Sequence, residues 1–336
     1  MKTCLVMAAL CAFLIAPCGC TKEGPAEGVV GKAGPAAKKT VIRVGHFPNI
    51  THAQGVIGHG LSRKAQGWFE ERLGPDVEIQ WFVYNAGPSA MEAIFAGSID
   101  LTYVGPNPAL NAYMRSRGDE IRVVSGAAFG GAGLVVQGDG RIRKPEDFRG
   151  RKIATPQLGN TQDVACRSWL KAKGYNVTLS GGDVAVLPTA NPDQLTLFAK
   201  GDLDGVWTVE PWVSRLILES KGTLFLEEPD AVTTILVSSV RFLREHRDLA
   251  RKFLQGHLEL TTWMEKNPGE AQDLVRGEIK IETTRDIAAE VLTMAWKRLK
   301  FTGGIALGHF EKSVAEAKDV GFIPELVDLS RLLEKP

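Results

Sequence analysis

Two segments of the chain repeat one pattern at a spacing of 104 residues, the distance from Pro88 to Pro192 (192 − 88). Each segment starts at a proline, runs to a glycine, and enters an apolar stretch through an aspartate, in residues 97–100 and 201–204. Proline in a first helical turn and glycine just past a helix end are common boundary signals. Any two helix–strand units share some of these signals, but several like pairs at one offset favour a true repeat. The pattern therefore predicts two similar lobes with a cleft between them.

Short β-rich runs alternate with helical stretches along most of the chain, which is typical of α/β layers with parallel sheets. After the long apolar run at 232–240 we expect helices to the end of the chain. In open parallel sheets, ligands bind beyond the carboxyl ends of the strands, where loops lead into helix N-termini. The expected strands are 41–47, 77–84, 99–104, 121–127, 134–137, 152–155, 184–188 and 204–209.

The N-terminus has the pattern of a bacterial lipoprotein signal. Lys2 precedes an apolar stretch at 5–16, and Gly19 then precedes Cys20. We predict a signal peptide over 1–20, with Cys20 as the lipidated first residue of the mature protein, and a flexible tether over 21–40, which is rich in Gly, Pro, Ala and Lys. Lipidation at Cys18, secretion without a lipid and a retained anchor are the alternatives.

Composition excludes several classes of protein. The chain has 40 basic and 39 acidic side chains, and this balance argues against nucleic acid as a partner. Beyond the N-terminus no apolar run is long enough for a membrane span, which excludes a multi-pass membrane protein. Four of the five cysteines lie in the first twenty residues. After processing, only Cys166 would remain as a possible free thiol, because Cys20 would carry the lipid, so no internal disulfide is expected, and Cys166 itself is expected to be a small buried hydrophobe.

The loops after the expected strands share one chemical character. They are rich in Gly, Asn, Ser and Thr, which cap helices and offer neutral donors. The first turn of a helix also has free N–H groups and the positive end of the helix dipole, both of which favour an anion. Each loop alone could serve only to cap its helix. Together they predict a site for a small anion, held without Lys or Arg, at the loops 47–51, 85–89, 105–107, 130–131 and 157–161.

Two tryptophans flank a carboxylate in the segment 207–212. At the edge of a cleft, Trp207 and Trp212 would form an aromatic wall, and Glu210 would suit an organic ligand that bears an amine. In the alternative interpretation both rings pack under the following helix and Glu210 caps its N-terminus.

Three histidines near the first strand raise the question of a metal. His52 and His59 share a helix face, but a zinc site needs a further ligand, and none lies in this segment. No metal site is therefore predicted. His46 ends the first strand and is a candidate ligand contact, His52 is expected to cap a helix or line the cleft, and His59 is expected to be a packed or exposed helical residue.

Four segments resemble the solute-binding proteins of ABC importers, of the nitrate/sulfonate/taurine type: residues 45–53, 92–100, 148–154 and 207–212. The resemblance implies an α/β, two-lobed, type II periplasmic-binding-protein fold, in which each lobe is a mostly parallel sheet flanked by helices. Lobe one would hold residues 41–135 and 236–336, and lobe two would hold 136–235. Two strands near 134–137 and 233–238 would form the hinge.

The implied function is that of an extracytoplasmic lipoprotein that captures a small anion, such as an aliphatic sulfonate, taurine or nitrate. It would be a lipid-anchored monomer of the periplasm or cell surface, with a permease and its ATPase as partners, no cofactor and no enzymatic activity. The alternative on the same fold is an enzyme similar to the synthases of the thiamine pyrimidine precursor, or a pyrimidine-binding protein. His46 and Gly130 join the positions implied by the family as the expected ligand-binding residues: Asn49, Ile50, Thr51, Gly87, Pro88, Ser89, Tyr103, Asn107, Gly159, Asn160, Thr161, Trp207 and Glu210.

Overall fold

The computed structural model describes residues 39–179, 181–323 and 328–336. The predicted signal peptide with Cys20, and the predicted tether up to residue 38, lie outside the described residues. Thr40, expected at the end of the tether, is already the first residue of strand β1. Among the helices of the described ranges, none combines the length and the apolar character required to cross a membrane.

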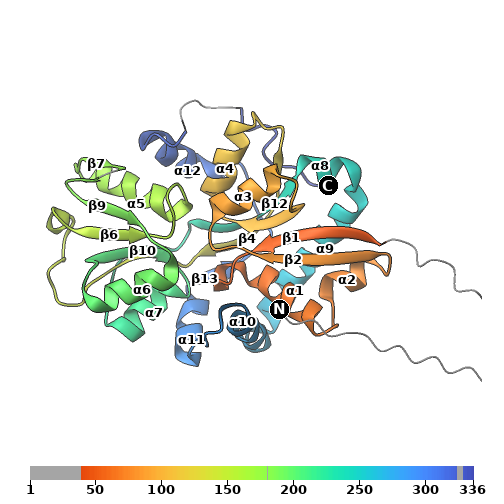
Figure 1. Ribbon diagram of the computed structural model, residues 1–336, viewed down its shortest axis with the longest axis horizontal. Coiled ribbons are helices and arrows are strands. Elements are labelled where there is room, and N and C mark those ends of the chain that lie inside the picture. The colour runs from red at the N-terminus through yellow and green to blue at the C-terminus, as the bar shows by residue number, and fades with distance from the viewer. Residues whose placement is uncertain (1–38, 180, 324–327) are drawn as a thin grey trace, which may run out of the picture. The chain divides into compact units, whose positions relative to one another are not determined.

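Two larger sheets organise the described chain (Figure 1). We call the six-stranded sheet with its covering helices lobe one, and the five-stranded sheet with its helices lobe two. Sheet one has the order β13 (Leu299–Phe301), β4 (Ile121–Gly130), β12 (Val232–Ser239), β3 (Leu101–Val104), β1 (Thr40–His46), β2 (Val77–Val83). Sheet two has the order β11 (Thr223–Glu228), β5 (Ala132–Val136), β10 (Gly205–Val209), β6 (Lys152–Thr155), β9 (Ala185–Pro188), and a separate pair joins β7 (Val177–Thr178) to β8 (Gly181–Gly182).

The two sheets have the same plan. In sheet one β1 lies parallel to both β2 and β3, and in sheet two β6 lies parallel to both β9 and β10. The next two strands of each sheet run antiparallel, β12 and β4 in sheet one, β5 and β11 in sheet two. The predicted α/β class is thus confirmed, with mixed rather than mostly parallel sheets. The antiparallel strands β5 and β12 are the ones that the chain enters directly after passing from the other lobe.

The repeat seen in the sequence has a shared structural cause. Asp100 accepts a hydrogen bond from the backbone N–H of Arg43, and Asp204 accepts one from that of Lys152, each at 2.9 Å. Both aspartates therefore anchor their own strand to the parallel strand beside it. The glycines before them end their helices in the left-handed region, with φ of 67° at Gly97 and 80° at Gly201, a conformation that glycine adopts without a Cβ penalty.

Helices cover both faces of each sheet, and alternate strand residues point to opposite faces. In β5, for example, Leu134 and Val136 pack in one core and Val135 in the other. One face of sheet one packs on α1 (Ala53–Arg63), α2 (Trp68–Leu73), α9 (Arg247–Lys266), α10 (Pro268–Thr283) and α11 (Ala289–Lys297), and the other face packs on α3 (Gly87–Phe95), α4 (Pro106–Arg115) and α12 (Gly308–Asp319). Sheet two packs on α5 (Thr161–Ala172) on one face and on α6 (Asn191–Lys200) and α7 (Trp212–Ser220) on the other. Helix α8 (Val240–Glu245) follows β12, and the short 3-10 turns η1 (Ile50–His52) and η2 (Pro145–Phe148) complete the elements.

The chain passes between the sheets at residues 130–132 and again at 228–232. The segments expected to form a two-strand hinge lie inside the sheets instead, 134–136 in β5 and 233–238 in β12. Gly130 stands at the first passage with φ of 73°, and its N–H donates to the carbonyl of Ala231 at 2.8 Å. A Cβ there would lie 2.5 Å from the carbonyl oxygen of Arg298, so Gly130 is required by the crossing rather than by a ligand.

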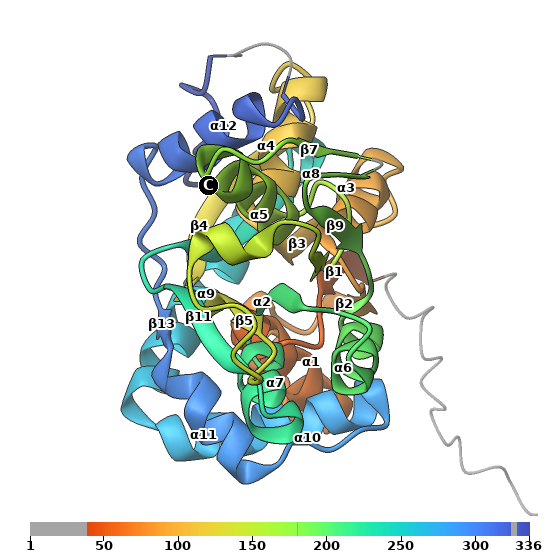
Figure 2. The same ribbon diagram turned by 90° about the vertical axis from the view of Figure 1, so that its left-hand side faces the viewer.

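The segment after β12 was expected to be all helical, but it also supplies edge strand β13, which pairs with β4. It is not confined to one lobe. Helix α11 packs against α7, and α12 contacts both α4 and α5 (Figure 1). Helix α10 lies beside α1, as both ribbon views show (Figure 1, Figure 2).

Candidate functional site

Six parallel strands end at one place between the lobes. The loops that follow β1, β2 and β3 meet those that follow β6, β9 and β10 around a cavity of about 30 Å³. This convergence is what the strand polarity predicts, because the carboxyl ends of parallel strands share one edge of each sheet. The lining residues are Phe47, Asn49, Thr51, His52, Asn85, Ala86, Gly87, Gly105, Pro108, Pro156, Asn160, Thr161, Gln162, Asn191, Val209 and Thr233.

The cavity wall is polar but carries no formal charge. Among its lining residues, all within the described chain, there is no Asp, Glu, Lys or Arg. Its only histidine, His52, is fully buried, and burial lowers its pKa well below the ordinary value, so the imidazole is neutral. His52 Nδ1 accepts a hydrogen bond from the N–H of Phe47, and the two rings stack. The site can thus offer hydroxyls, amides and backbone N–H groups, but no cation.

Several helices begin at this cavity without a side-chain cap. Helix α3 starts after Ala86 and α4 starts after Gly105, and neither residue has a side chain that can accept from the first-turn N–H groups. The turn η1 follows Asn49, whose side chain makes no capping bond. Helix α5 differs, because Asn160 Oδ1 accepts from the N–H of Asp163 at 2.8 Å. In α3 the missing cap leaves the N–H groups of Gly87 and Ser89 and the positive end of the helix dipole available to an anion. In α4 the first three residues supply only the N–H of Asn107, because Pro106 and Pro108 have none, and that N–H donates to Thr161.

Two hydrogen bonds cross from one lobe to the other beside the cavity. Trp212 Nε1 of α7 donates to Asn49 Oδ1 at 3.1 Å, and both residues are buried. The backbone N–H of Asn107 in α4 donates to Thr161 Oγ1 of α5 at 3.4 Å. These contacts close the cavity between the lobes.

A larger cleft of about 580 Å³ adjoins the cavity and shares five lining residues with it, Asn49, Asn85, Ala86, Pro156 and Asn191. Ser89 and the Trp212 ring also line this cleft, together with Pro48 and Ile279. Unlike the cavity, the cleft carries charges of both signs: Asp193, Arg215, Glu282 and Arg285.

The arginines of the cleft were missed by sequence reasoning, which looked for cations only in the loops. Arg215 lies one turn into α7, and its side chain is 13% exposed. It pairs with Glu219 and lies over the Trp212 ring, 5.1 Å from the ring centroid. The spacing of Trp212 and Arg215 along one helix face was the signal that could have placed both at the cleft.

The structure brings together only part of the predicted site. Asn49, Thr51, Gly87, Asn160 and Thr161 line the cavity, and Ser89 lines the cleft. The other candidates line neither of these two spaces: His46, Ile50, Pro88, Tyr103, Asn107, Gly130, Gly159, Trp207 and Glu210. Pro88 and Gly159 face a separate groove that also contains Phe322, and Ile50 lies in the core of lobe one.

Tyr103 and Trp207, one hundred and four positions apart, are inward-facing strand residues. Trp207 is buried in the core of lobe two, and its Nε1 donates to Glu228 Oε2 at 3.1 Å. Tyr103 is buried in lobe one, with its hydroxyl 3.1 Å from His257 Nδ1. The expected aromatic wall at Trp207 is therefore wrong, and Trp212 takes that place because it follows the strand end.

Glu210 caps helix α7, as the alternative interpretation held. Its Oε2 accepts from the N–H of Ser214 at 3.1 Å and its Oε1 from the hydroxyl of Ser214 at 2.9 Å. Its side chain is fully buried, and burial raises its pKa to about 7 against the opposing bonds from Ser214. Arg298 Nε lies 3.4 Å from Glu210 Oε1. Glu210 lines neither the cavity nor the cleft.

The cavity wall also contains residues that the family-based set lacks. Asn85 lies in one of the predicted loops, whereas Gln162, Asn191 and Thr233 were not predicted at all. Asn191 opens α6, the repeat counterpart of α3, and the repeat was the available signal. Thr233 comes from β12 and could not be found without the sheet order. Cys166 is buried in the core of lobe two, as expected, and burial raises the pKa of its thiol.

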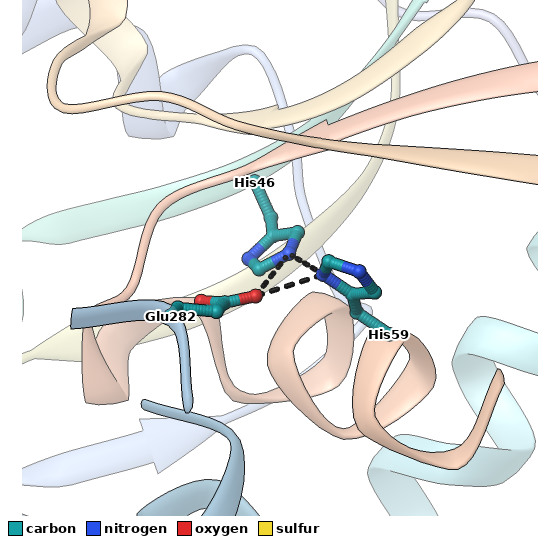
Figure 3. A group of neighbouring side chains, drawn as sticks. All are labelled: His46, His59 and Glu282. Atoms are coloured by element: carbon teal, nitrogen blue, oxygen red, sulfur yellow. Dashed lines mark hydrogen bonds and ion pairs between the residues drawn. The ribbon is translucent and has the colours of Figure 1, made fainter. Parts of the chain in front are cut away.

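Three buried side chains meet at the end of β1 (Figure 3). His46 Nε2 lies 2.9 Å from His59 Nδ1, and Glu282 Oε1 lies 3.1 Å from the first and 2.8 Å from the second. No metal site was expected because no further ligand lies close to these histidines in sequence. Glu282, however, belongs to α10 and follows His59 by 223 residues. Burial opposes ionisation of Glu282, but the two histidines more than offset it and lower the pKa of the carboxyl.

The two lobes with matching strand orders are those of the type II periplasmic-binding-protein fold. The structure is similar to the alkanesulfonate-binding protein of Xanthomonas axonopodis pv. citri bound to MOPS, with a TM-score of 0.72 and 18% identity over 90% of this chain and 100% of that chain. It is also similar to a zinc-bound ligand-binding component of an ABC-type import system from Staphylococcus aureus, with a TM-score of 0.70 and 16% identity over 88% and 97% of the chains.

In sequence, residues 35–277 match the NMT1-like family, and the chain belongs to that family. The taurine-binding periplasmic protein of Escherichia coli strain K12 is 24% identical over 200 residues, which are 58% of this chain and 60% of that protein. A putative aliphatic sulfonates-binding protein of the same strain is 26% identical over 51% of each chain. The chain thus matches between half and three fifths of the length of these relatives, and each of them is named a binding protein, not an enzyme.

Proposed function

We propose that this chain is the solute-binding component of an ABC importer and that it captures a small organic anion with an oxyanion head group, of the sulfonate type. The carrying observation is the convergence of six strand ends, with the uncapped start of α3 among the loops that follow them, on a polar cavity whose wall has no charge. Such a wall can surround an oxyanion with donors while avoiding a buried fixed cation. The names of the relatives, which bind taurine or sulfonates, support the same ligand class.

The sizes of the two spaces support a division of the ligand into head and tail. A cavity of about 30 Å³ holds roughly the volume of one or two waters, so only a compact head group fits. The adjoining cleft of about 580 Å³ has room for an organic tail beside Trp212, Pro48 and Ile279. MOPS, which the Xanthomonas relative binds, is a sulfonate with such a tail. Arg215 and Arg285 line this cleft together with Asp193 and Glu282, so its formal charges balance.

Capture would proceed by closure of the lobes. In the open form the two sets of strand ends separate about the passages at 130–132 and 228–232, and in the closed form the Trp212–Asn49 bond joins them. A permease with its ATPase would then bind the closed form. We propose that the lobes divide at these two passages, a few residues before the boundaries at 135/136 and 235/236 expected from the sequence, because β5 belongs to sheet two and β12 to sheet one. The protein would be a monomer held at the outer face of a membrane by a lipid on Cys20, in keeping with the periplasmic address of the taurine-binding relative.

The test is a ligand screen of the full-length protein. Taurine, ethanesulfonate, MOPS and nitrate are compared by thermal shift and then by titration calorimetry, with ethylamine and a hydroxymethyl pyrimidine as controls. A ligand at 100 times its Kd should add about 2.7 kcal/mol to the free energy of unfolding. Binding of a sulfonate and not of ethylamine supports the proposal. Binding of the pyrimidine alone would contradict it and favour the thiamine-precursor alternative, and binding of none of them would also contradict it.

A further inference from the structure

The cluster of His46, His59 and Glu282 contains more close contacts than its protons can satisfy (Figure 3). Three polar atoms lie within 3.1 Å of one another, so there are three close contacts to explain. His46 Nδ1 lies 3.3 Å from the carbonyl oxygen of Phe47, and donation there leaves Nε2 as a lone pair that faces the cluster. In that tautomer a proton on His59 Nδ1 serves one contact, and the contact between His46 Nε2 and Glu282 Oε1 sets two lone pairs together. In a doubly protonated His46 the Nε2 proton serves Glu282, but then either the N–H groups of His46 and His59 or the lone pairs of His59 and Glu282 face each other, so one contact is unsatisfied in every state.

Burial makes this unresolved contact costly. The side chains of His46 and Glu282 are fully buried, and that of His59 is 9% exposed. The second oxygen of Glu282, Oε2, is also buried and has no hydrogen-bond partner among the described residues. A buried acceptor without a partner carries its full desolvation cost. A cation among the three atoms would accept all three lone pairs at once.

We propose that His46, His59 and Glu282 bind one divalent transition-metal ion of the zinc type. Two imidazole nitrogens with one carboxylate are a common zinc ligand set, with bonds of about 2.0–2.2 Å. Tetrahedral ligands at that distance lie about 3.3–3.6 Å apart. The present separations of 2.8–3.1 Å are shorter, so binding needs only small outward shifts of the three side chains.

The surroundings of the cluster support the ligands as metal sites require. The Nδ1 of His46 faces a backbone carbonyl, which is the usual way a ligating histidine is held in its tautomer. The His59 ring stacks on Trp81 at an interplanar angle of 13°, which holds its orientation. Glu278 lies 3.6 Å from His59 Nδ1 and pairs with Arg63, so a further carboxylate stands near the site. Donors from β1, α1 and α10 would be joined by one ion.

The site has a consequence for the cleft, and this consequence alone depends on the proposed function. Glu282 belongs to the cluster and also borders the cleft, although its side chain is fully buried, so its carboxylate lies behind the cleft wall. A free carboxylate there repels an incoming anion, whereas a carboxylate bound to a divalent cation does not. The metal would therefore also fasten the end of α10 to lobe one and remove a negative charge from the wall that an anion approaches.

The experiment measures metal binding directly and needs no solute. Full-length protein is treated with EDTA, mixed with zinc and passed through gel filtration, and its zinc content is determined by mass spectrometry. We expect one equivalent of zinc in the parent, none above background with magnesium, and visible bands typical of four-coordinate cobalt when Co²⁺ replaces zinc. A parent protein that retains no zinc overturns the proposal, whatever solute it binds.

Variants locate the ion. Glu282→Gln and His59→Gln should each lose at least tenfold in zinc affinity, whereas His309→Gln, which removes an exposed histidine of α12, should match the parent. All variants keep the four cysteines at positions 4–20, so zinc held by those thiols would survive both substitutions. Equal zinc binding in the parent and in folded Glu282→Gln, with folding checked by circular dichroism, overturns the assignment.

Discussion

The indole of Trp212 in lobe two donates a hydrogen bond to the side-chain oxygen of Asn49 in lobe one, with 3.1 Å between Nε1 and Oδ1. The bond joins the first turn of α7 to the loop after β1, and it lies where the cavity and the cleft meet. It therefore links closure of the lobes to the wall of the candidate site.

Replacing Trp212 by phenylalanine removes this bond and keeps most of the ring. A hydrogen bond contributes about 0.5–1.5 kcal/mol, so we expect a loss of roughly 2- to 12-fold in affinity for the identified anion, measured by titration calorimetry. Trp68→Phe is the matched control, because it removes a bond to the carbonyl of Gly256 within lobe one. Equal affinities for the parent and Trp212→Phe would show that the bond does not contribute to capture.

Two hydroxyls test the assignment of the site. Thr161 lines the cavity and Ser89 the cleft, and a hydrogen bond to a charged group contributes about 1.5–3 kcal/mol. Thr161→Val and Ser89→Ala should each weaken anion binding tenfold or more. Thr196→Val removes an exposed hydroxyl on α6 and should leave affinity unchanged. If both site variants bind as tightly as the parent, the anion binds elsewhere.

Glu210 should make stability fall as pH rises. Burial raises the pKa of its carboxyl from 4.5 to about 7 in the folded protein. Between these values the folded state holds a proton that the unfolded state has released, so the stabilisation present below pH 4.5 is lost as pH rises to about 7. The full effect is on the order of 3 kcal/mol.

Glu210→Gln cannot titrate and should remove this slope. Urea unfolding at pH 5 and pH 8 measures it as the change in the free-energy difference between parent and variant. Glu265→Gln, at an exposed carboxylate of α9, is the control and should follow the parent. Parallel curves for the parent and Glu210→Gln would contradict the assignment.

Gly130 should tolerate a side chain less well than other glycines with the same backbone. Gly130 and Gly150 have φ of 73° and 75°, but a Cβ at Gly150 meets no atom within 4 Å, whereas one at Gly130 meets a carbonyl oxygen at 2.5 Å. Gly150→Ala should cost about 1–2 kcal/mol of unfolding free energy from strain alone. Gly130→Ala should lower the free energy of unfolding distinctly more in the same urea titration. Equal losses for the two variants would show that the backbone at 130–132 shifts to make room for the Cβ.

Local signals in the chain were sufficient to predict the α/β layers and the internal repeat. Proline and glycine mark the ends of α3 and α6, and the aspartates after them bond to a neighbouring strand in the same way in both lobes. The polar loops that line the cavity were also visible, because each follows its own strand directly. These features depend on residues close in sequence, where helix capping and strand alternation act.

Other features required the packed structure. Tyr103 and Trp207 are aromatic residues that could equally form the wall of a binding site, but the alternation of side chains along their strands directs them into the cores. Trp212 lines the cleft because it lies beyond the end of its strand. Glu282 reaches His46 and His59 only because α10 packs beside α1. Contacts between distant segments depend on which faces the helices bury against one another. That choice minimises exposed apolar surface over the whole fold, so no local pattern encodes it.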